Sequence, residues 1–348
     1  MASYFPVRAF VAALTSLLLA LGLGALPAEA APHKKRTKAQ IAWTADTWVS
    51  GSGAGYALTG TLNGKKRRAV QLQYKTASGW RTLSRTRSQD HAFALSGTWD
   101  WYGVHKVRVR VPATGQHRAA SFGHAVTVQS GYAARGLADD YKLTRYKQRR
   151  LRMDPCQTVN YRINTAQIGP AVDPLVHSAV ALFSRATGIE FKFVGTSDKI
   201  ALLAGRLEKR TDLLIGWANE GQLPSLKGTV ARGGPLRVVP GRDRNGRLWK
   251  VTQAGVTVNW NTTTAGPGQA VDLTMDSQSR ATLGMTLLHE MGHAFGLAHA
   301  SKGEEGRQQL MYWSIDMLPW SDGWFRSLFG AGDLTGLNKV GLAAGCVR

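Results

Sequence analysis

Proline, cysteine and long hydrophobic runs are all scarce in this sequence of 348 residues. The chain has 12 prolines beside 39 glycines, and 43% of its residues are hydrophobic, a balance typical of globular proteins. This composition argues against a disordered chain and against a polytopic membrane protein. The length suggests two domains.

The main apolar run lies at the N-terminus, over residues 9–26, and it follows Arg8. Small residues at Ala28 and Ala30 fit a cleavage site, so residues 1–30 are predicted to be a signal peptide. A transmembrane anchor is the alternative, because the run is just long enough to span a bilayer. An anchor would leave the basic residues at 34–38 on the exported side, against the positive-inside tendency. We therefore expect a secreted, extracellular protein that can associate with the cell wall.

The sequence has two cysteines, Cys156 and Cys346. In an exported chain such a pair normally forms one disulfide, whereas two unpaired thiols are the alternative. A bridge would close a loop of 190 residues, for which the chain-entropy model gives about 5 kcal/mol of stabilisation.

Acidic residues are rare in the front half of the chain. Residues 31–152 hold 23 Lys and Arg against 5 Asp and Glu, a net charge of +18, whereas residues 153–348 carry only +4. The excess suggests an anionic partner, such as a cell-surface polymer, a membrane surface or nucleic acid, or a solvated surface that only aids solubility. Among these we expect an anionic cell-surface polymer, no specific nucleic acid and a monomeric protein.

Residues 41–129 have an all-β pattern. In 105–111, valines alternate with Arg108 and Arg110, which is typical of a half-buried strand. Similar short runs, separated by turn signals, occur at 56–62, 69–76 and 125–129. The region is predicted to be an accessory β-sandwich, and in pattern it resembles the immunoglobulin-like domains of exported bacterial enzymes. Its four histidines are scattered and form no catalytic cluster.

A basic linker is expected over 130–152, and an α/β domain over 153–348. A helix should run from Asp173 to about Thr187 and end at Gly188. Further helices are expected near 280–296 and 333–343, a glycine- and arginine-rich loop over 232–247, and strands at 158–164, 189–194, 211–217 and 255–260. The fold class is thus multidomain, an all-β sandwich followed by an α+β (α/β) domain with a twisted mixed sheet.

Residues 289–299 read His-Glu-Met-Gly-His-Ala-Phe-Gly-Leu-Ala-His, the pattern H-E-x-x-H-x-x-G-x-x-H. On a helix, His289 and His293 fall about 40° apart around the axis, so both imidazoles can reach one Zn²⁺. Gly296 can end the helix in the left-handed conformation and let the chain bring His299 to the metal. Three ligands leave a fourth position for water, and Glu290, which would not ligate, could take the proton of that water.

With this motif the chain resembles the metzincin zinc metallopeptidases, over most of residues 153–348. The segment Gln309-Leu310-Met311-Tyr312 is similar to the family's Met-turn, and the resemblance implies that Met311 forms an apolar floor beneath the zinc. Residues 332–337 resemble the segment of the matrixin branch whose aspartate, here Asp333, ties the last helix to that turn. The resemblance therefore implies an active-site helix and one catalytic Zn²⁺ held by His289, His293 and His299.

Other branches match less well. Astacins and serralysins place tyrosine where Trp313 stands, adamalysins place aspartate where Ala300 stands, and snapalysins place aspartate where His299 stands. The chain also departs from matrixins. No free cysteine precedes Cys156 to block the zinc, and His177 is the only histidine in 153–288, so we expect no second zinc.

These observations predict a secreted zinc-dependent endopeptidase in which Glu290 activates a Zn-bound water. An extended protein or peptide substrate would pair with an edge strand or rim supplied by residues around 228–238. One alternative is a cell-surface binding protein that uses the basic β region, with a vestigial zinc site. Another is amidase or peptidoglycan chemistry at the same site. The sequence does not decide the natural substrate, the activation route or whether structural Ca²⁺ binds.

Overall fold

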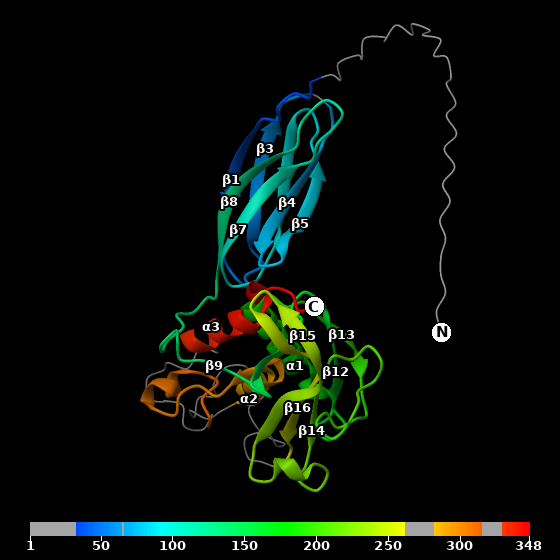
Figure 1. The fold of residues 1–348 in the computed structure, drawn as a ribbon, viewed down its shortest axis with the longest axis vertical. Helices are drawn as coiled ribbons and strands as arrows, with labels where there is room; N and C mark the ends of the chain where they lie inside the picture. Colours follow the sequence, from blue (N-terminus) through cyan, green and yellow to red (C-terminus); the bar gives the residue numbers. More distant parts are fainter. Residues whose placement is uncertain (1–32, 65, 262–281, 315–328) are drawn as a thin grey trace, which may run out of the picture.

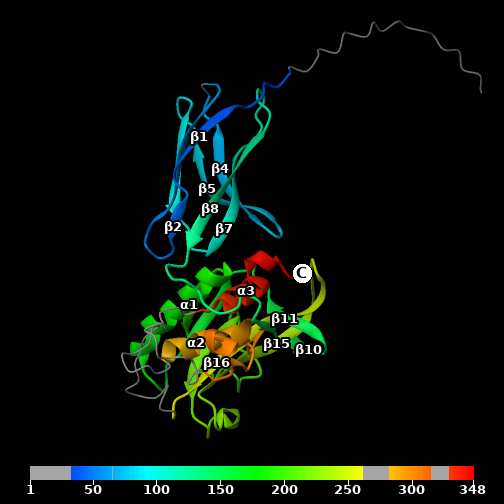
Figure 2. The ribbon, with the colours of Figure 1, turned by 90° about the vertical axis from the view of Figure 1, so that its left-hand side faces the viewer.

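The computed structural model describes residues 33–64, 66–261, 282–314 and 329–348. The predicted signal peptide lies outside these ranges. The fold is mixed α and β and consists mostly of strands, with several sheets and, in the described ranges, three α-helices. No helix of the described residues is long and apolar enough to cross a membrane. Figures 1 and 2 show a strand-only region, residues 33–129, above a region that carries all three helices.

Two sheets pack face to face in the strand-only region. One has the order β1-β3-β6 and the other the order β2-β8-β7-β4-β5. Their strands are β1 (Ala39–Ala45), β2 (Thr47–Val49), β3 (Gly55–Leu62), β4 (Ala69–Thr76), β5 (Gly79–Arg87), β6 (Ala92–Thr98), β7 (Gly103–Val111) and β8 (Ala120–Gln129). The predicted alternation in β7 is confirmed, because Val107, Val109 and Val111 are buried in the core between the sheets while Arg110 is exposed.

A seven-stranded mixed sheet forms the base of the second region. Its order is β10-β11-β16-β14-β12-β13, and β15 pairs antiparallel with β16. These strands are β10 (Arg145–Tyr146), β11 (Arg149–Met153), β12 (Val159–Asn164), β13 (Phe191–Thr196), β14 (Leu213–Ala218), β15 (Ala231–Asp243) and β16 (Gly246–Asn259). A separate two-stranded sheet joins β9 (Lys142–Leu143) to β17 (Leu297–Ala298).

Three α-helices accompany this sheet: α1 (Asp173–Thr187), α2 (Leu283–Phe295) and α3 (Ala331–Val340). Short 3₁₀ turns lie at Pro170–Val172, Pro224–Leu226, Glu304–Gln308 and Leu342–Ala344. Gly188 ends α1 with φ of 70°, the left-handed conformation that glycine adopts without strain. This matches the helix end that the sequence predicts.

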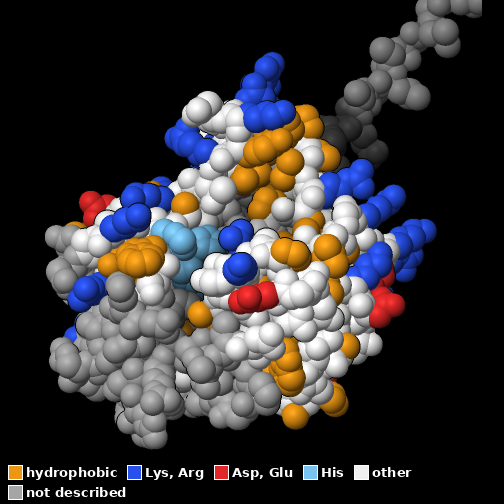
Figure 3. Space-filling model, turned by 90° about the horizontal axis from the view of Figure 1, so that it is seen from below, with side chains coloured by type: hydrophobic (Ala, Val, Ile, Leu, Met, Phe, Trp, Pro, Cys, Tyr) orange, Lys and Arg blue, Asp and Glu red, His pale blue; other side chains and the backbone are white. Residues whose placement is uncertain are grey.

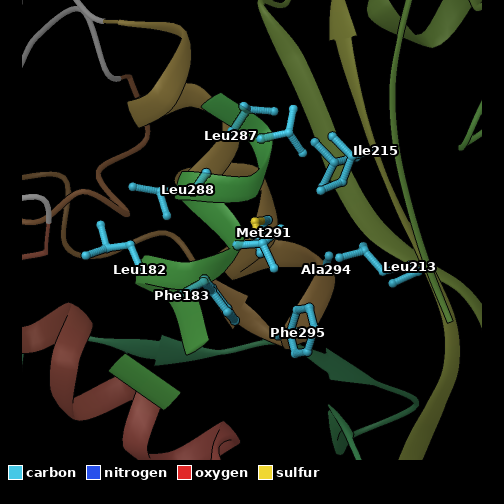
Figure 4. Close-up of a cluster of buried hydrophobic side chains, with 14 of the residues drawn as sticks. Leu182, Phe183, Leu213, Ile215, Leu287, Leu288, Met291, Ala294 and Phe295 are labelled. Carbon is cyan, nitrogen blue, oxygen red and sulfur yellow. The ribbon is translucent and has the colours of Figure 1, made fainter. Parts of the chain in front are cut away.

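Helix α2 lies at the centre of the main core. Figure 4 shows its apolar side chains Leu287, Met291 and Phe295 between strand β14, which supplies Leu213 and Ile215, and helix α1. All five side chains are buried, so α2 cannot turn about its axis without opening this core. The opposite face of the helix therefore keeps a fixed orientation.

Two predicted segments differ from the structure. The range 232–247, expected to be a loop, forms most of strand β15, because antiparallel pairing with β16 over its whole length satisfies its backbone groups. The end of the expected linker, 130–152, forms strand β11, which pairs parallel with β16 and buries Leu151 and Arg152.

The predicted disulfide between Cys156 and Cys346 is present, with the two Cα atoms 5.2 Å apart. It lies beside the turn between β4 and β5. There the Ser78 hydroxyl accepts a 2.9 Å hydrogen bond from the backbone N–H of Cys346, and Arg81 donates to the carbonyl of Cys156 at 3.1 Å. These two hydrogen bonds connect the strand-only region to the region that carries the helices. A third such hydrogen bond runs from the backbone N–H of Tyr102 to the carbonyl of Arg185, at 2.9 Å.

Candidate metal centre

Helix α2 carries two of the three predicted metal ligands. Its first turn is capped by Thr282, whose hydroxyl accepts a hydrogen bond from the backbone N–H of Met285 at 3.3 Å. It ends at Gly296, where φ is 107°. A Cβ at this glycine would lie 2.2 Å from the carbonyl oxygen of Leu151, so glycine is needed for its conformation and for its space.

The three predicted histidines meet at one point. The Nε2 atom of His293 lies 3.1 Å from Nε2 of His289 and 3.1 Å from Nε2 of His299. Tetrahedral coordination with Zn–N bonds of about 2.05 Å would place two such nitrogens about 3.3 Å apart. The separations therefore fit three ligands of one zinc ion.

The hydrogen bonds of the Nδ1 atoms of His289 and His293 explain why their Nε2 atoms can bind a metal ion. Nδ1 of His289 lies 2.7 Å from the carbonyl oxygen of Leu310, and Nδ1 of His293 lies 2.9 Å from that of Leu297. A carbonyl only accepts, so each Nδ1 carries the proton and each Nε2 presents a lone pair. Lone pairs about 3 Å apart repel each other, and a cation between them removes that repulsion. The donor set thus fits a metal ion.

Burial keeps these imidazoles neutral. It lowers the pKa of His289 well below the ordinary value, with His293 adding to the effect, and it lowers the pKa of His293 to about 4. The pKa of His299 is also lowered, by burial and then by the charge of Lys302. Neutral imidazole is the form that binds a metal, so proton competition at neutral pH is small.

Glu290 lines the same cavity as the three histidines. In the motif it is not one of the predicted metal ligands. Its side chain is buried, and burial raises its pKa to about 7, while a backbone hydrogen bond with Gly233 and the charge of Arg232 act the other way. A carboxylate with a pKa in this range can both take and return a proton near neutral pH.

Strand β15 runs directly over the segment of α2 that holds Glu290. It pairs with β16 on one side, and no strand of the described residues pairs with its other side. At Arg242 this outer side exchanges two backbone hydrogen bonds with Arg348, whereas around 231–238 the described residues place no further strand against it, so that stretch can accept one. This is the segment around 228–238 that the sequence predicts to supply an edge strand or rim.

Gly233 permits the close approach of β15 and α2. A Cβ at this position would lie 1.9 Å from the backbone oxygen of Glu290, whereas a Cβ at neighbouring Gly234 meets no atom within 4 Å. We expect Gly233→Ala to lower the free energy of unfolding by about 1–3 kcal/mol, because β15 must move away from the helix. Gly234→Ala is the matched control and should change it by less than about 0.5 kcal/mol. Thermal unfolding of both variants measures the difference, and equal stabilities would contradict this account.

Met311 packs beneath the helix that carries the ligands. It is buried, and a Cβ at Gly292 would lie 2.4 Å from its sulfur atom. Its carbonyl accepts a 2.8 Å hydrogen bond from the backbone N–H of Ala300, next to His299. Met311 therefore contacts the chain next to two of the three histidines, His293 and His299.

Asp333 of α3 holds the turn that contains Met311. Its carboxylate accepts hydrogen bonds from the backbone N–H groups of Leu310, Met311 and Gly330, and its own N–H donates to the Gln309 side chain at 3.0 Å. Burial raises the pKa of Asp333 to about 7, against the effect of those three donors. The contact that the resemblance implies between the last helix and this turn is thus present.

Residues 140–144, just before β10, contact the chain on either side of His299, the third predicted ligand. Strand β9 pairs with β17, directly before His299, and the Thr144 hydroxyl donates to the carbonyl of Leu297 at 2.9 Å. The Asp140 carboxylate accepts hydrogen bonds from the backbone N–H of Ser301 at 2.8 Å and from its hydroxyl at 3.1 Å. Sequence reasoning placed this segment in a linker and missed its role.

The histidines and Glu290 line a cavity of about 770 Å³. Figure 3 shows histidine side chains reaching the surface on this side of the molecule, with lysine and arginine side chains near them. The predicted rim segment contributes Thr229 and Arg232 to the lining, and Leu202, Ser225, Thr286 and Ser314 line it from segments that the sequence did not single out. Trp313 also lines the cavity and is 43% exposed, so its indole is available for contact with a ligand.

Comparisons with known proteins add little to this picture. No protein-family model matches the chain, and no curated protein matches it significantly. Among solved structures, a match is found to a crystal structure of beta-glucosidase from Listeria innocua, at 15% identity and a TM-score of 0.18. The match covers 28% of this chain and 16% of that chain, and it supports no inference about fold or activity.

Proposed function

We propose that this protein is a zinc-dependent endopeptidase of the metzincin type, closest to the matrixin branch. The observation that carries the proposal is the convergence of three Nε2 atoms in a cavity that also contains a buried carboxylate. This cavity lies beside residues 231–238 of β15, whose outer side pairs with no other strand in the described part of the chain. His289, His293 and His299 would hold the metal. The two regions of the fold would be an accessory β-sandwich domain and a catalytic domain of an exported protein.

The chemistry divides between the ion and the chain. When bound, Zn²⁺ would polarise the scissile carbonyl and lower the pKa of a water molecule in the cleft. Glu290 takes the proton from the attacking water and returns it to the nitrogen of the leaving amine. Its buried position beside the histidines keeps bulk water from competing for that proton.

Strand β15 orients the substrate. An extended peptide that pairs with its open edge exchanges backbone hydrogen bonds with it, so binding depends on the main chain rather than on one side chain. The edge continues into Gly233 and Ala231, which line the cavity, and the bound peptide would therefore pass over Glu290. This arrangement favours internal peptide bonds over other amides, because it needs an extended chain on both sides of the cleaved bond.

A chelation experiment tests the proposal. The chain from residue 31 onward is assayed against a library of quenched fluorescent peptides, before and after treatment with a zinc chelator. We expect cleavage that is lost with the chelator and restored by equimolar Zn²⁺, but not by Mg²⁺, which prefers oxygen ligands. Cleavage that survives removal of the metal, or failure to cleave any peptide, would contradict it.

A further inference from the structure

The outer face of the five-stranded sheet in the strand-only region carries a concentration of positive charge. In each strand the side chains that alternate with the buried core residues point outward. Six of the outward residues are basic, and we call this surface the basic face: Lys75, Arg85, Arg87, Lys106, Arg108 and Arg110. Five of the six are exposed, and Arg108 is half-buried.

No negative charge from the sheet balances this surface. Strands β2, β4, β5, β7 and β8 contain neither aspartate nor glutamate. Within the described residues, none of the six basic side chains forms an ion pair. Mutual repulsion on such a face is relieved when an anion binds.

Pairing of the strands places the charges in rows. Arg85, Gln71 and Arg110 stand opposite one another across three strands, so the Cα atoms of the two arginines are about 10 Å apart. In the next row Gln73 stands opposite Arg108. The basic face therefore offers a regular array of cations rather than one isolated pocket.

The centre of the array is held in place by polar contacts. Arg108 donates from Nε to the side-chain oxygen of Gln73 at 2.9 Å, and Gln73 donates to that of Gln71 at 3.0 Å. The guanidinium of Arg108 also lies over the ring of Trp80, 4.2 Å from its centroid. Because these contacts already order Arg108, binding an anion there costs little side-chain entropy.

We propose that the basic face is a docking surface for a flexible phosphodiester polymer without bases, such as poly(glycerol phosphate). Guanidinium groups match phosphate oxygens in geometry and charge, and an array of them suits a repeating anion. A single-stranded nucleic acid would need open aromatic rings for stacking, but Arg108 and Lys75 already lie over Trp80. A membrane would need a cluster of large apolar anchors, but only Val49 and Val104 are exposed large hydrophobic side chains on the five strands of this sheet.

The test measures binding of a fluorescein-labelled synthetic poly(glycerol phosphate) of about 20 units to the full mature chain, over a salt series. In the first variant Arg85, Lys106 and Arg110 are replaced by glutamine, which leaves the contacts of Arg108 intact. We expect affinity to fall about 100-fold at the lowest salt concentration, and the slope of log K against log[salt] to become shallower by about 2.

The matched control removes the same charge elsewhere. Lys192, Arg206 and Lys209 are exposed residues of the second region, and their replacement by glutamine should leave affinity within about threefold. Equal losses in the two variants, no binding by the parent chain, or binding that ignores salt would overturn the proposal. Tighter, face-dependent binding of a single-stranded oligonucleotide or of anionic phosphatidylglycerol vesicles would overturn the choice of partner. Thermal unfolding confirms that each variant is folded.

Discussion

Replacing Glu290 by glutamine should lower kcat/KM for peptide cleavage by about 10³- to 10⁴-fold while the bound zinc content stays unchanged. The amide has the same size as the carboxylate and fits the same buried position, but it cannot accept a proton. Since Glu290 is not one of the three converging ligands, the metal should remain in place. Kinetics on a cleaved library peptide, together with metal analysis of the purified variant, measure both quantities.

A matched control separates this effect from a general change of charge. Glu190 is an exposed glutamate that precedes strand β13, and Glu190→Gln should leave kcat/KM unchanged within about twofold. Glu290→Ala should behave like Glu290→Gln, with zinc retained and activity lost. Full activity in either Glu290 variant would remove the proposed general base and with it the proposed mechanism.

Replacing His293 by alanine should weaken zinc binding by about 10²- to 10³-fold and abolish peptide cleavage. Its Nε2 atom lies 3.1 Å from each of the other two, so its loss leaves two nitrogens that cannot form a tripodal site. Competition with a chromophoric chelator measures the affinity, and equilibrium dialysis measures the stoichiometry. One zinc per chain is expected for the parent protein.

His177→Ala is the control for this variant. His177 accepts or donates a 2.7 Å hydrogen bond with the Tyr161 hydroxyl and lies outside the cavity that contains the three converging histidines. Its removal should leave zinc affinity and stoichiometry unchanged. If His293→Ala bound zinc as tightly as the parent chain, the three histidines would not be the metal site.

The candidate site could be predicted from the sequence because it is almost entirely local. His289, Glu290 and His293 occupy one helix, and the helical repeat alone places both imidazoles on one face. The glycine that ends this helix and the third histidine follow within six residues of His293. Geometry over so short a segment depends on the backbone and little on the rest of the fold.

Strand β15 could not be predicted in the same way. Its glycines and its two prolines, Pro235 and Pro240, lower its intrinsic strand propensity, so the sequence favours a loop. Tertiary structure reverses this preference, because β16 offers a partner over the whole length of the strand and α2 leaves no room for a side chain at Gly233. Gly233, whose residue type favours a loop, is needed here because it lets β15 pack closely against α2.

The contacts that hold His299 were also beyond sequence reasoning. Asp140 and Ser301 are separated by 161 positions in the chain, and no periodicity or motif connects them. Many basic residues follow Asp140 and suggest a solvated linker, although Leu151 and Arg152 at its end are buried. Burial of an arginine depends on distant partners, here the carboxylate of Asp243 at 3.0 Å and the carbonyl of Gly345 at 2.7 Å.

The position of this segment limits how the chain could be shortened during maturation. The carbonyl of Leu137 accepts a hydrogen bond from the Gln309 side chain at 3.3 Å, and Asp140, β9 and Thr144 follow within seven residues. A processing cut upstream of Leu137 could release the strand-only region and spare all of these contacts. A cut between Leu137 and Thr144 would instead break the chain inside the segment that bonds to Ser301 and Leu297, on either side of His299.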